Sequence, residues 1–187
     1  MSSVQKAKEQ IDFENCYQEF APRLFAVAYR LLRNQTDALD VVQESFLRAF
    51  RKRNNFRGRA KVSTWLYRIV TNRCYDVLRK RSREKKIEYG ENYHAKSAGF
   101  NGEHWLQQEK MIAMVRQEME KLTEKQKTVF ILRVYEELPY DEIARITHSR
   151  VGTVKATFFQ SVMKIRKGLK ERGVFANELR KDEKAVN

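Results

Sequence analysis

The sequence has 187 residues, of which 42% are hydrophobic, and its 38 lysines and arginines exceed its 24 acidic residues, so the net charge is +14. A chain of this length forms one ordinary domain or two small ones, and a strongly basic one is expected to bind a polyanion such as DNA, RNA or an anionic membrane surface. It contains no recognisable secretory leader and no apolar stretch long enough to span a bilayer, which argues against a membrane-embedded protein and predicts a cytoplasmic location.

The composition favours helices throughout. Only 7 glycines and 2 prolines occur, and alternating apolar runs of strand length are scarce. We predict an all-α fold of two small helical domains joined by a flexible linker, the second containing a helix-turn-helix. The boundaries are placed at 1–85, 86–108 and 109–187, and the last range ends in a charged tail. Cys16 and Cys74 have no partners at ligand spacing, so they are predicted to be buried thiols, with no metal site, disulfide or cofactor.

The first predicted helix carries a buried stripe and ends near Asn34. The stripe comprises Tyr17, Phe20, Leu24, Val27, Ala28 and Leu31. Thr36 is expected to cap the next helix. The inward residues of that second helix are Ala38, Val42, Ser45, Phe46 and Ala49.

A different face of the second helix bears a row of acids. Asp37, Asp40, Glu44 and Leu47 recur at helical spacing on this face. One interpretation is a solvated surface, on which Asp37 is favoured by the helix dipole. The other is a docking surface for a protein partner, which the apolar Leu47 favours.

A cationic loop, Phe-Arg-Gly-Arg-Ala-Lys at 56–61, precedes a third helix predicted from about Ser63 to Arg81. Its inward residues are Leu66, Ile69, Val70, Cys74 and Val77, and its outward residues are Tyr67, Arg68, Thr71, Asn72, Tyr75 and Arg79. The outward face is either a solvated surface or a binding site. A basic loop beside exposed aromatic rings suits a site that grips phosphates and holds unstacked bases, which indicates opened DNA as the ligand.

The second domain is predicted to begin with a helix carrying Ile112, Val115, Met119 and Leu122. Thr123-Glu-Lys-Gln126 is a capping-box signature for the next helix. Pro139 opens a short helix, and a turn at 148–150 leads into a final helix. The inward residues of the final helix are Val151, Val154, Phe158, Val162, Ile165 and Leu169. Two helices joined by a tight turn indicate a helix-turn-helix.

The outward residues of the final helix are candidates for reading duplex DNA, although a solvated surface would look similar. They are Thr153, Lys155, Ala156, Thr157, Gln160 and Lys164. Gln160 can pair with adenine, Thr157 can touch a thymine methyl group or a phosphate, and Lys155 mostly contacts the backbone. Phe159 fits neither interpretation, because a large exposed ring needs a partner surface or further packing.

Several motifs stand in a specific order. They are Asp-Ala-Leu-Asp-Val-Val-Gln-Glu-Ser-Phe at 37–46, Phe-Arg-Gly at 56–58, Ser-Thr-Trp-Leu-Tyr-Arg-Ile at 63–69, Asn72, and Val-Gly-Thr-Val-Lys at 151–155. With them the sequence resembles the extracytoplasmic-function group of bacterial sigma factors, over residues 13–170 apart from the linker. The resemblance implies a transcription initiation factor rather than an enzyme, with no catalytic residues.

The resemblance also implies partners and site residues. Core RNA polymerase, through its β′ clamp helices, would meet Asp37, Asp40, Gln43, Glu44 and Leu47. A flipped −10 base of promoter DNA would meet Phe56, Arg57, Gly58, Arg59, Ala60, Lys61, Ser63, Trp65, Arg68 and Asn72. The −35 duplex would meet Arg150, Thr153, Lys155, Ala156, Thr157, Gln160 and Lys164. The second domain would also contact the β flap, the linker would thread toward the active-site cleft, and an anti-sigma factor is a possible partner.

The last helix and the turn before it depart from the family pattern. Thr157 and Gln160 stand where arginines are frequent, so phosphate contacts by this helix are weaker or differently arranged, and the −35 preference cannot be transferred from relatives. Arg150 stands where proline is common and could recover one backbone contact. The principal alternative is a stand-alone helix-turn-helix regulator, which would not need the acidic row. Membrane-surface binding by the basic run 79–81 is not expected, since the apolar side of that helix is used in the core.

Overall fold

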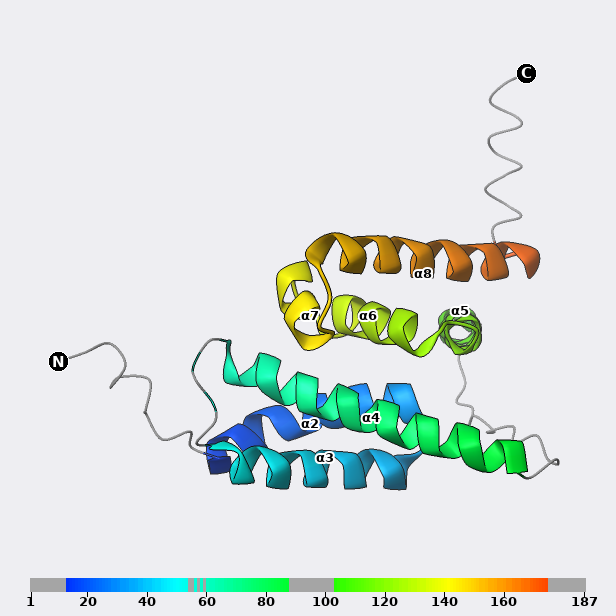
Figure 1. Cartoon of the computed structure of the whole chain (residues 1–187). Coiled ribbons are helices and arrows are strands. Elements are labelled where there is room, and N and C mark those ends of the chain that lie inside the picture. The colour runs from blue at the N-terminus through cyan, green and yellow to red at the C-terminus, as the bar shows by residue number, and fades with distance from the viewer. Residues whose placement is uncertain (1–12, 54–55, 57, 59, 88–102, 175–187) are drawn as a thin grey trace, which may run out of the picture.

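The computed structural model describes residues 13–53, 56, 58, 60–87 and 103–174 (Figure 1). Helices dominate these segments, and no strand occurs among the residues so described. The helices are α2 (Phe13–Leu32), α3 (Gln35–Arg51), α4 (Val62–Ile87), α5 (Glu103–Glu120), α6 (Glu124–Val134), α7 (Tyr140–Ile146) and α8 (Val151–Glu171). They form two groups, α2–α4 and α5–α8, which confirms the predicted all-α fold.

The first group is held together by the apolar stripes of three long helices. Leu24 and Val27 of α2, Val42 of α3, and Leu66 and Val70 of α4 are all buried at the centre of the bundle. Each of these residues recurs at the three- and four-residue spacing that places side chains on one helical face. The bundle thereby fixes the outer faces of α3 and α4, on which the predicted binding residues lie.

The start of α3 differs from the sequence prediction. Asn34, rather than Thr36, is the capping residue, and its side chain accepts a hydrogen bond from the backbone N–H of Asp37 at 2.9 Å. Asn34 has the extended backbone, with φ −140° and ψ 126°, that turns a side-chain oxygen toward the first free N–H groups of a helix. Thr36 already lies inside the first turn and cannot perform this function.

The second group contains the predicted helix-turn-helix. Thr123 and Gln126 form the predicted capping box at the start of α6, and each side chain accepts from the backbone N–H of the other at 3.3 Å. Pro139 immediately precedes α7. His148, with φ 49°, lies in the turn that leads into α8. The predicted linker of 86–108 falls mostly outside the described residues, and its two ends belong to α4 and α5.

The buried face of α8 is partly different from the predicted one. Val154, Ile165 and Leu169 are buried as expected, whereas Val151 and Val162 are more than a third exposed. The covered stripe runs instead through the small residues Ser161 and Gly168, which are both buried. Small side chains allow neighbouring helices to approach closely, so α5 and α6 lie over these positions and leave the valines at the margin.

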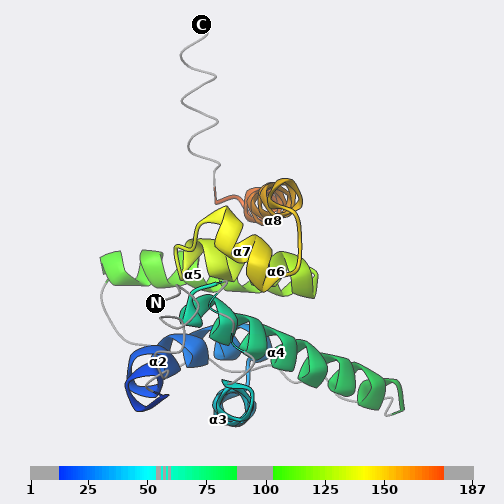
Figure 2. The same cartoon turned by 60° about the vertical axis from the view of Figure 1, so that its left-hand side comes forward.

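The two groups pack against each other through α4 and α7 and through α2 and α6 (Figures 1 and 2). This contact buries part of the α4 face that was predicted to be exposed. Tyr67 is 2% exposed and Thr71 is also buried, so their predicted outward placement is wrong. Tyr75 on the same side donates from its hydroxyl to Thr128 Oγ1 at 2.7 Å. The cause is a contact between segments far apart in the chain, which helical periodicity does not reveal.

Candidate functional site

The outer face of α3 combines acidic and apolar side chains. We call it the α3 face, and it comprises Asp37, Asp40, Gln43, Glu44 and Leu47. Leu47 is 57% exposed, and Asp40 is also exposed. Asp37 is paired with Arg81 and Glu44 with Arg73, both on α4. Two of the three carboxylates are therefore partly neutralised within the chain, while Asp40 and Leu47 face outward.

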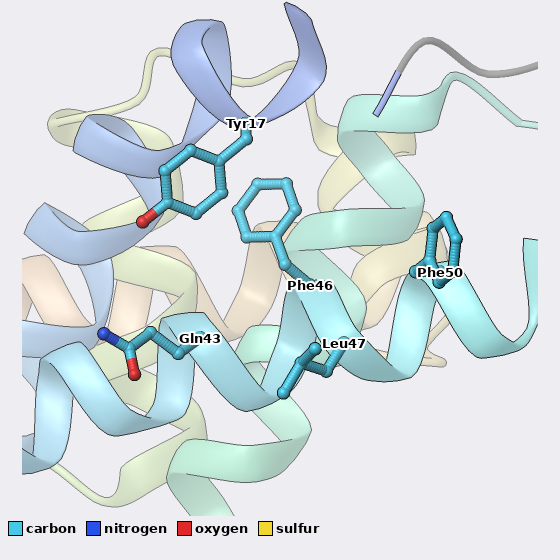
Figure 3. A pocket seen from close by; sticks show the side chains of 5 residues that line it. All are labelled: Tyr17, Gln43, Phe46, Leu47 and Phe50. Carbon is cyan, nitrogen blue, oxygen red and sulfur yellow. The ribbon is translucent and has the colours of Figure 1, made fainter. Parts of the chain in front are cut away.

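A shallow groove adjoins the α3 face (Figure 3). It has a volume of about 470 Å³ and is lined by Tyr17, Gln43, Phe46, Leu47 and Phe50. Tyr17, which was predicted to be buried, is nearly half exposed and rests edge-on against the Phe46 ring, with centroids 4.8 Å apart. An apolar groove next to an acidic row is suited to a helical segment of another protein.

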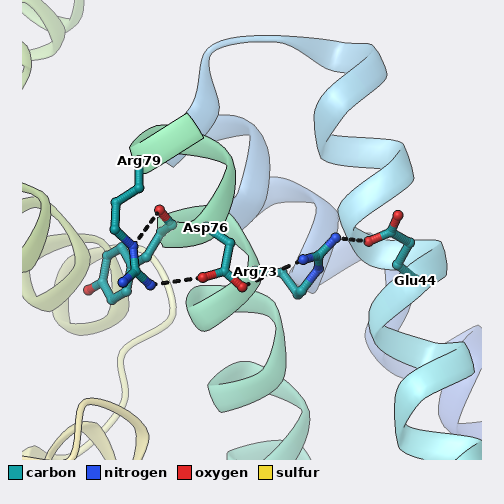
Figure 4. Close-up of polar contacts among 5 residues, drawn as sticks. Glu44, Arg73, Asp76 and Arg79 are labelled. Atoms are coloured by element: carbon teal, nitrogen blue, oxygen red, sulfur yellow. Dashed lines mark hydrogen bonds and ion pairs between the residues drawn. The ribbon is translucent and has the colours of Figure 1, made fainter. Parts of the chain in front are cut away.

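Arg73 connects the α3 face to the surface of α4 (Figure 4). Its guanidinium binds Glu44 and also lies 3.5 Å from Asp76 Oδ2, while Arg79 Nη2 lies 2.8 Å from Asp76 Oδ1. The hydrogen bond to Glu44 is the largest cause that raises the pKa of Arg73 above its ordinary value. Within this chain of charges the Glu44–Arg73 pair joins α3 to α4, while Asp76 and Arg79 belong to α4 itself.

The loop before α4 and the first turns of that helix form a second surface. We call it the α4 face; its described members from the predicted set are Phe56, Gly58, Ala60, Lys61, Ser63, Trp65, Arg68 and Asn72. Arg57 and Arg59 lie outside the described residues. The Phe56 and Trp65 rings pack with centroids 5.1 Å apart, and Gly58 has φ 67°, a conformation that favours glycine.

Helical spacing brings four members of the α4 face together. Lys61, Trp65, Arg68 and Asn72 follow one another at three- or four-residue steps, so they project from one side of the helix start. Lys61 and Asn72 are exposed, whereas Trp65 and Arg68 are half-buried. Two cations, an indole and an amide in one row can bind phosphate oxygens and the edge and face of a base.

The third surface is the outer side of α8. Arg150 precedes the helix, and Thr153, Lys155, Ala156, Gln160 and Lys164 are all exposed. Three of the predicted contact residues are partly engaged within the chain, and the first is Lys155, whose Nζ lies 5.8 Å from the centroid of the Tyr140 ring. Thr157 donates from its hydroxyl to the carbonyl oxygen of Thr153 at 2.8 Å, and Lys164 Nζ donates to Gln126 Oε1 at 3.1 Å. Gln160 is the clearest candidate to read a base edge.

Phe159 is the residue on α8 that the predicted site set left out. It is 65% exposed, beside Gln160 on the side of the helix away from the core. An exposed ring on a helix that enters the major groove can contact a thymine methyl group. The sequence already contained the signal, namely a large apolar residue outside the buried stripe.

The described residues give little support to a metal site, a reactive thiol or a membrane-spanning helix. Within them, no group of three histidine, cysteine, aspartate or glutamate side chains is arranged to hold a metal ion. Burial raises the pKa of the Cys74 thiol to about 12, so this thiol is a poor nucleophile. None of the helices in the described ranges is long and apolar enough to cross a bilayer.

Comparison with known proteins identifies the family of this chain. Residues 16–84 match the family description Sigma-70 region 2, and residues 112–165 match Sigma-70, region 4. The chain is 31% identical over 159 residues to the RNA polymerase sigma-H factor of Pseudomonas aeruginosa, a match that covers 81% of this chain and 82% of that protein. It is 29% identical over 180 residues to the ECF RNA polymerase sigma factor SigW of Bacillus subtilis, covering 89% and 93%.

Solved structures show the same fold. The sigma factor RpoE of Bartonella quintana, solved with the anti-sigma factor NepR, superposes with a TM-score of 0.68 at 23% identity and covers 85% of this chain and 97% of that one. CnrH, solved with the cytosolic domain of CnrY, superposes with a TM-score of 0.64 at 20% identity, covering 90% and 95%.

Proposed function

This chain belongs to the extracytoplasmic-function group of the sigma-70 family, and we propose that it directs core RNA polymerase to specific promoters. The observation that carries the proposal is the pairing of region 2 with region 4 in family order on one chain. A stand-alone helix-turn-helix regulator has no use for region 2, so that alternative is not favoured. The chain would act as an initiation factor that catalyses no reaction itself, in the cytoplasm, where polymerase and DNA are found.

The proposed division of labour follows the two helical groups. Residues 1–85 would form the region that binds the polymerase clamp and opens the −10 element. Residues 109–187 would form the region that reads the −35 element and meets the β flap, and 86–108 would link them. The region matches and the extensive packing of helices within each group support this division.

We assign polymerase docking to the α3 face and its groove. Exposed Asp40 and Leu47 offer a charge and an apolar anchor beside the ring of Phe50. Buried apolar anchors supply most of the affinity of protein interfaces, and charges at the rim steer association. The β′ clamp helices would lie along this face. An anti-sigma factor, the partner named for the solved neighbour RpoE, is a candidate occupant of the same groove.

We assign −10 recognition to the α4 face. Lys61 and Arg68 would hold phosphates of the non-template strand, and Asn72 would bind the edge of a base that has left the stack. Phe56 and Trp65, whose rings already pack together, would stack against the face of that base. A captured base stabilises only the opened duplex, so this face would contribute to melting as well as to sequence choice.

Energetics explain why the chain would act with polymerase rather than alone. Opening about ten base pairs costs on the order of 14 kcal/mol, at roughly 1.4 kcal/mol per stacking step. One stacked base returns only about 1 to 3 kcal/mol. The remaining free energy must come from polymerase contacts and supercoiling.

We assign −35 recognition to the outer side of α8. Its first turns would enter the major groove, with Gln160 reading a base and Phe159 touching a thymine methyl group. Lys155 and Arg150 would bind backbone phosphates. The side of α8 away from the core is open to solvent, as this arrangement needs.

The decisive experiment adds the purified chain to core RNA polymerase and maps transcription start sites on a genomic DNA library. We expect a discrete set of starts preceded by two shared sequence elements. Core polymerase that initiates at the same positions with and without the chain would contradict the proposed function.

A further inference from the structure

Glu136, in the turn after α6, is buried against the first helical group. It is 7% exposed. Arg23 Nε of α2 donates to its Oε2 at 3.1 Å, and the Tyr67 hydroxyl of α4 donates to the same oxygen at 2.6 Å. A segment of the second group is thus fixed to two helices of the first.

Glu142, in α7, makes a similar contact with the beginning of α4. It is also 7% exposed, and Lys61 Nζ donates to its Oε1 at 2.5 Å. The Thr64 hydroxyl donates to the other carboxylate oxygen at 3.3 Å. We call Glu136 and Glu142, with these four partners, the clasp.

The clasp is a specific contact rather than incidental packing. Buried carboxylates are strongly unfavourable unless cations and hydrogen-bond donors meet them, and both glutamates have such partners. Further contacts join the same two groups. Arg30 of α2 lies 4.2 Å above the ring of Tyr135, and Arg33 Nε lies 3.5 Å from Glu120 Oε1. Several independent contacts of this kind indicate that the two groups have one preferred arrangement.

The clasp overlaps the surface assigned to −10 DNA. Lys61 belongs to the α4 face, and Thr64 adjoins Trp65. The carboxylate of Glu142 and a DNA phosphate are both anions that would bind the same ammonium group, so the two compete for it. In addition, α7 lies directly against the start of α4, where a non-template strand would run (Figure 2).

We propose that the clasp is an autoinhibitory contact, in which α7 acts as an internal acidic competitor of the −10 strand. The proposal rests on the assignment of the α4 face to −10 DNA. In the closed arrangement the α3 face and the outer side of α8 lie away from the contact (Figure 1). Polymerase docking and −35 binding are thus compatible with the clasp, whereas −10 capture requires its release.

The contact itself can be tested without DNA. A carbodiimide joins an amine to a carboxylate only where the two touch, so treatment of the dilute full chain should yield an amide between Lys61 and Glu142, identified by mass spectrometry of peptides. Glu142→Gln should abolish this product. Absence of the wild-type product would overturn the clasp, whatever promoter activity the chain shows.

The competition is tested by adding short single-stranded DNA of mixed sequence to the same reaction. We expect the Lys61–Glu142 product to decrease as DNA binds. A product that stays constant while the DNA is demonstrably bound would overturn the competition and leave the promoter function of the chain intact.

A matched pair of variants measures the effect on affinity. Glu136→Gln with Glu142→Gln removes both clasp charges, and Glu137→Gln with Asp141→Asn removes two exposed charges beside them. The clasp variant should bind the single-stranded DNA about fivefold more tightly than the control variant, because the closed state no longer competes. Equal affinities would overturn the autoinhibitory role, and circular dichroism would verify that both variants are folded.

Discussion

The guanidinium of Arg73 on α4 binds the carboxylate of Glu44 on α3, so an acid assigned to polymerase docking already has a partner within the chain. Asp37 is similarly held by Arg81. Any partner that approaches the α3 face must therefore tolerate or exchange these internal pairs. Asp40, Gln43 and Leu47 are exposed members of this face that a partner can engage without such an exchange.

Asp40→Lys should weaken binding to core polymerase about tenfold, or about 1.4 kcal/mol, because it reverses an exposed charge on the docking face. Fluorescence anisotropy with labelled chain and purified core polymerase measures the effect. Glu84→Lys, an exposed charge reversal near the end of α4 and outside the α3 face, is the matched control. Equal core affinities for the two folded variants would remove the clamp assignment from α3.

Gly168→Ala should destabilise the second helical group. A β-carbon at Gly168 would overlap the carboxylate of Glu118 on α5, which is buried and also pairs with Arg172 and Lys121. Overpacking of this kind costs roughly 1 to 3 kcal/mol, so the midpoint of thermal unfolding should fall. Gly152→Ala is the control, because a β-carbon there meets no atom within 4 Å. Similar unfolding midpoints would mean that α5 and α8 are less tightly packed than described.

Alkaline pH should destabilise the chain through three groups of α4, because burial raises the pKa of Tyr67 as well as those of Tyr75 and Cys74. Burial raises the pKa of Tyr75 from 10.0 to about 12 and that of Cys74 from 9.0 to about 12. The folded chain keeps these protons where the unfolded chain has released them, so stability falls as the pH rises from about 9 to 12. Urea unfolding at a series of pH values measures this, and Tyr75→Phe should reduce the slope above pH 10. An unchanged slope in that variant would mean that Tyr75 is not buried in solution.

Local signals in the sequence were sufficient for much of the fold. The spacing of Leu24, Val27, Val42 and Val70 predicted their burial, and Thr123 with Gln126 predicted a capping box that the structure contains. These features depend on residues a few positions apart. The choice between Asn34 and Thr36 as a cap failed because both residue types suit the position, and only the backbone conformation distinguishes them.

Contacts between segments far apart in the chain could not be predicted from these local signals. Tyr67 and Thr71 were placed on an exposed face, yet the second helical group covers them. Helical periodicity specifies which residues share a face but not which partner covers it. The acidic character of the α3 face was evident in the sequence. Its pairing with Arg73 and Arg81 was not, because those arginines lie on another helix.

Gln160→Ala should relax the preference at one or two −35 base pairs at a cost of about 1 to 3 kcal/mol, whereas Lys155→Ala should weaken all promoters alike and reduce the salt dependence of binding. Phe159→Ala should lower the preference for thymine at a single position. Selection from libraries randomised over the −35 element distinguishes the three variants. An unchanged consensus for Gln160→Ala would show that this residue reads no base.

Asn72→Ala should impair promoter opening more than polymerase binding or −35 docking. Asn72 is exposed on the α4 face, to which the packed Phe56 and Trp65 rings also belong, and its amide is proposed to bind a base only after that base leaves the stack. Loss of the contact raises the free energy of the opened state alone, which slows the appearance of unpaired thymines in a permanganate assay. Glu84→Ala, an exposed change on the same helix, is the control.

A template with an unpaired bubble over the −10 element supplies the opening energy in advance, so it should partly restore transcription by Asn72→Ala. Opening of linear duplexes at the wild-type rate, or an equal loss of core binding, would show that this residue has no specific role in capturing the −10 base.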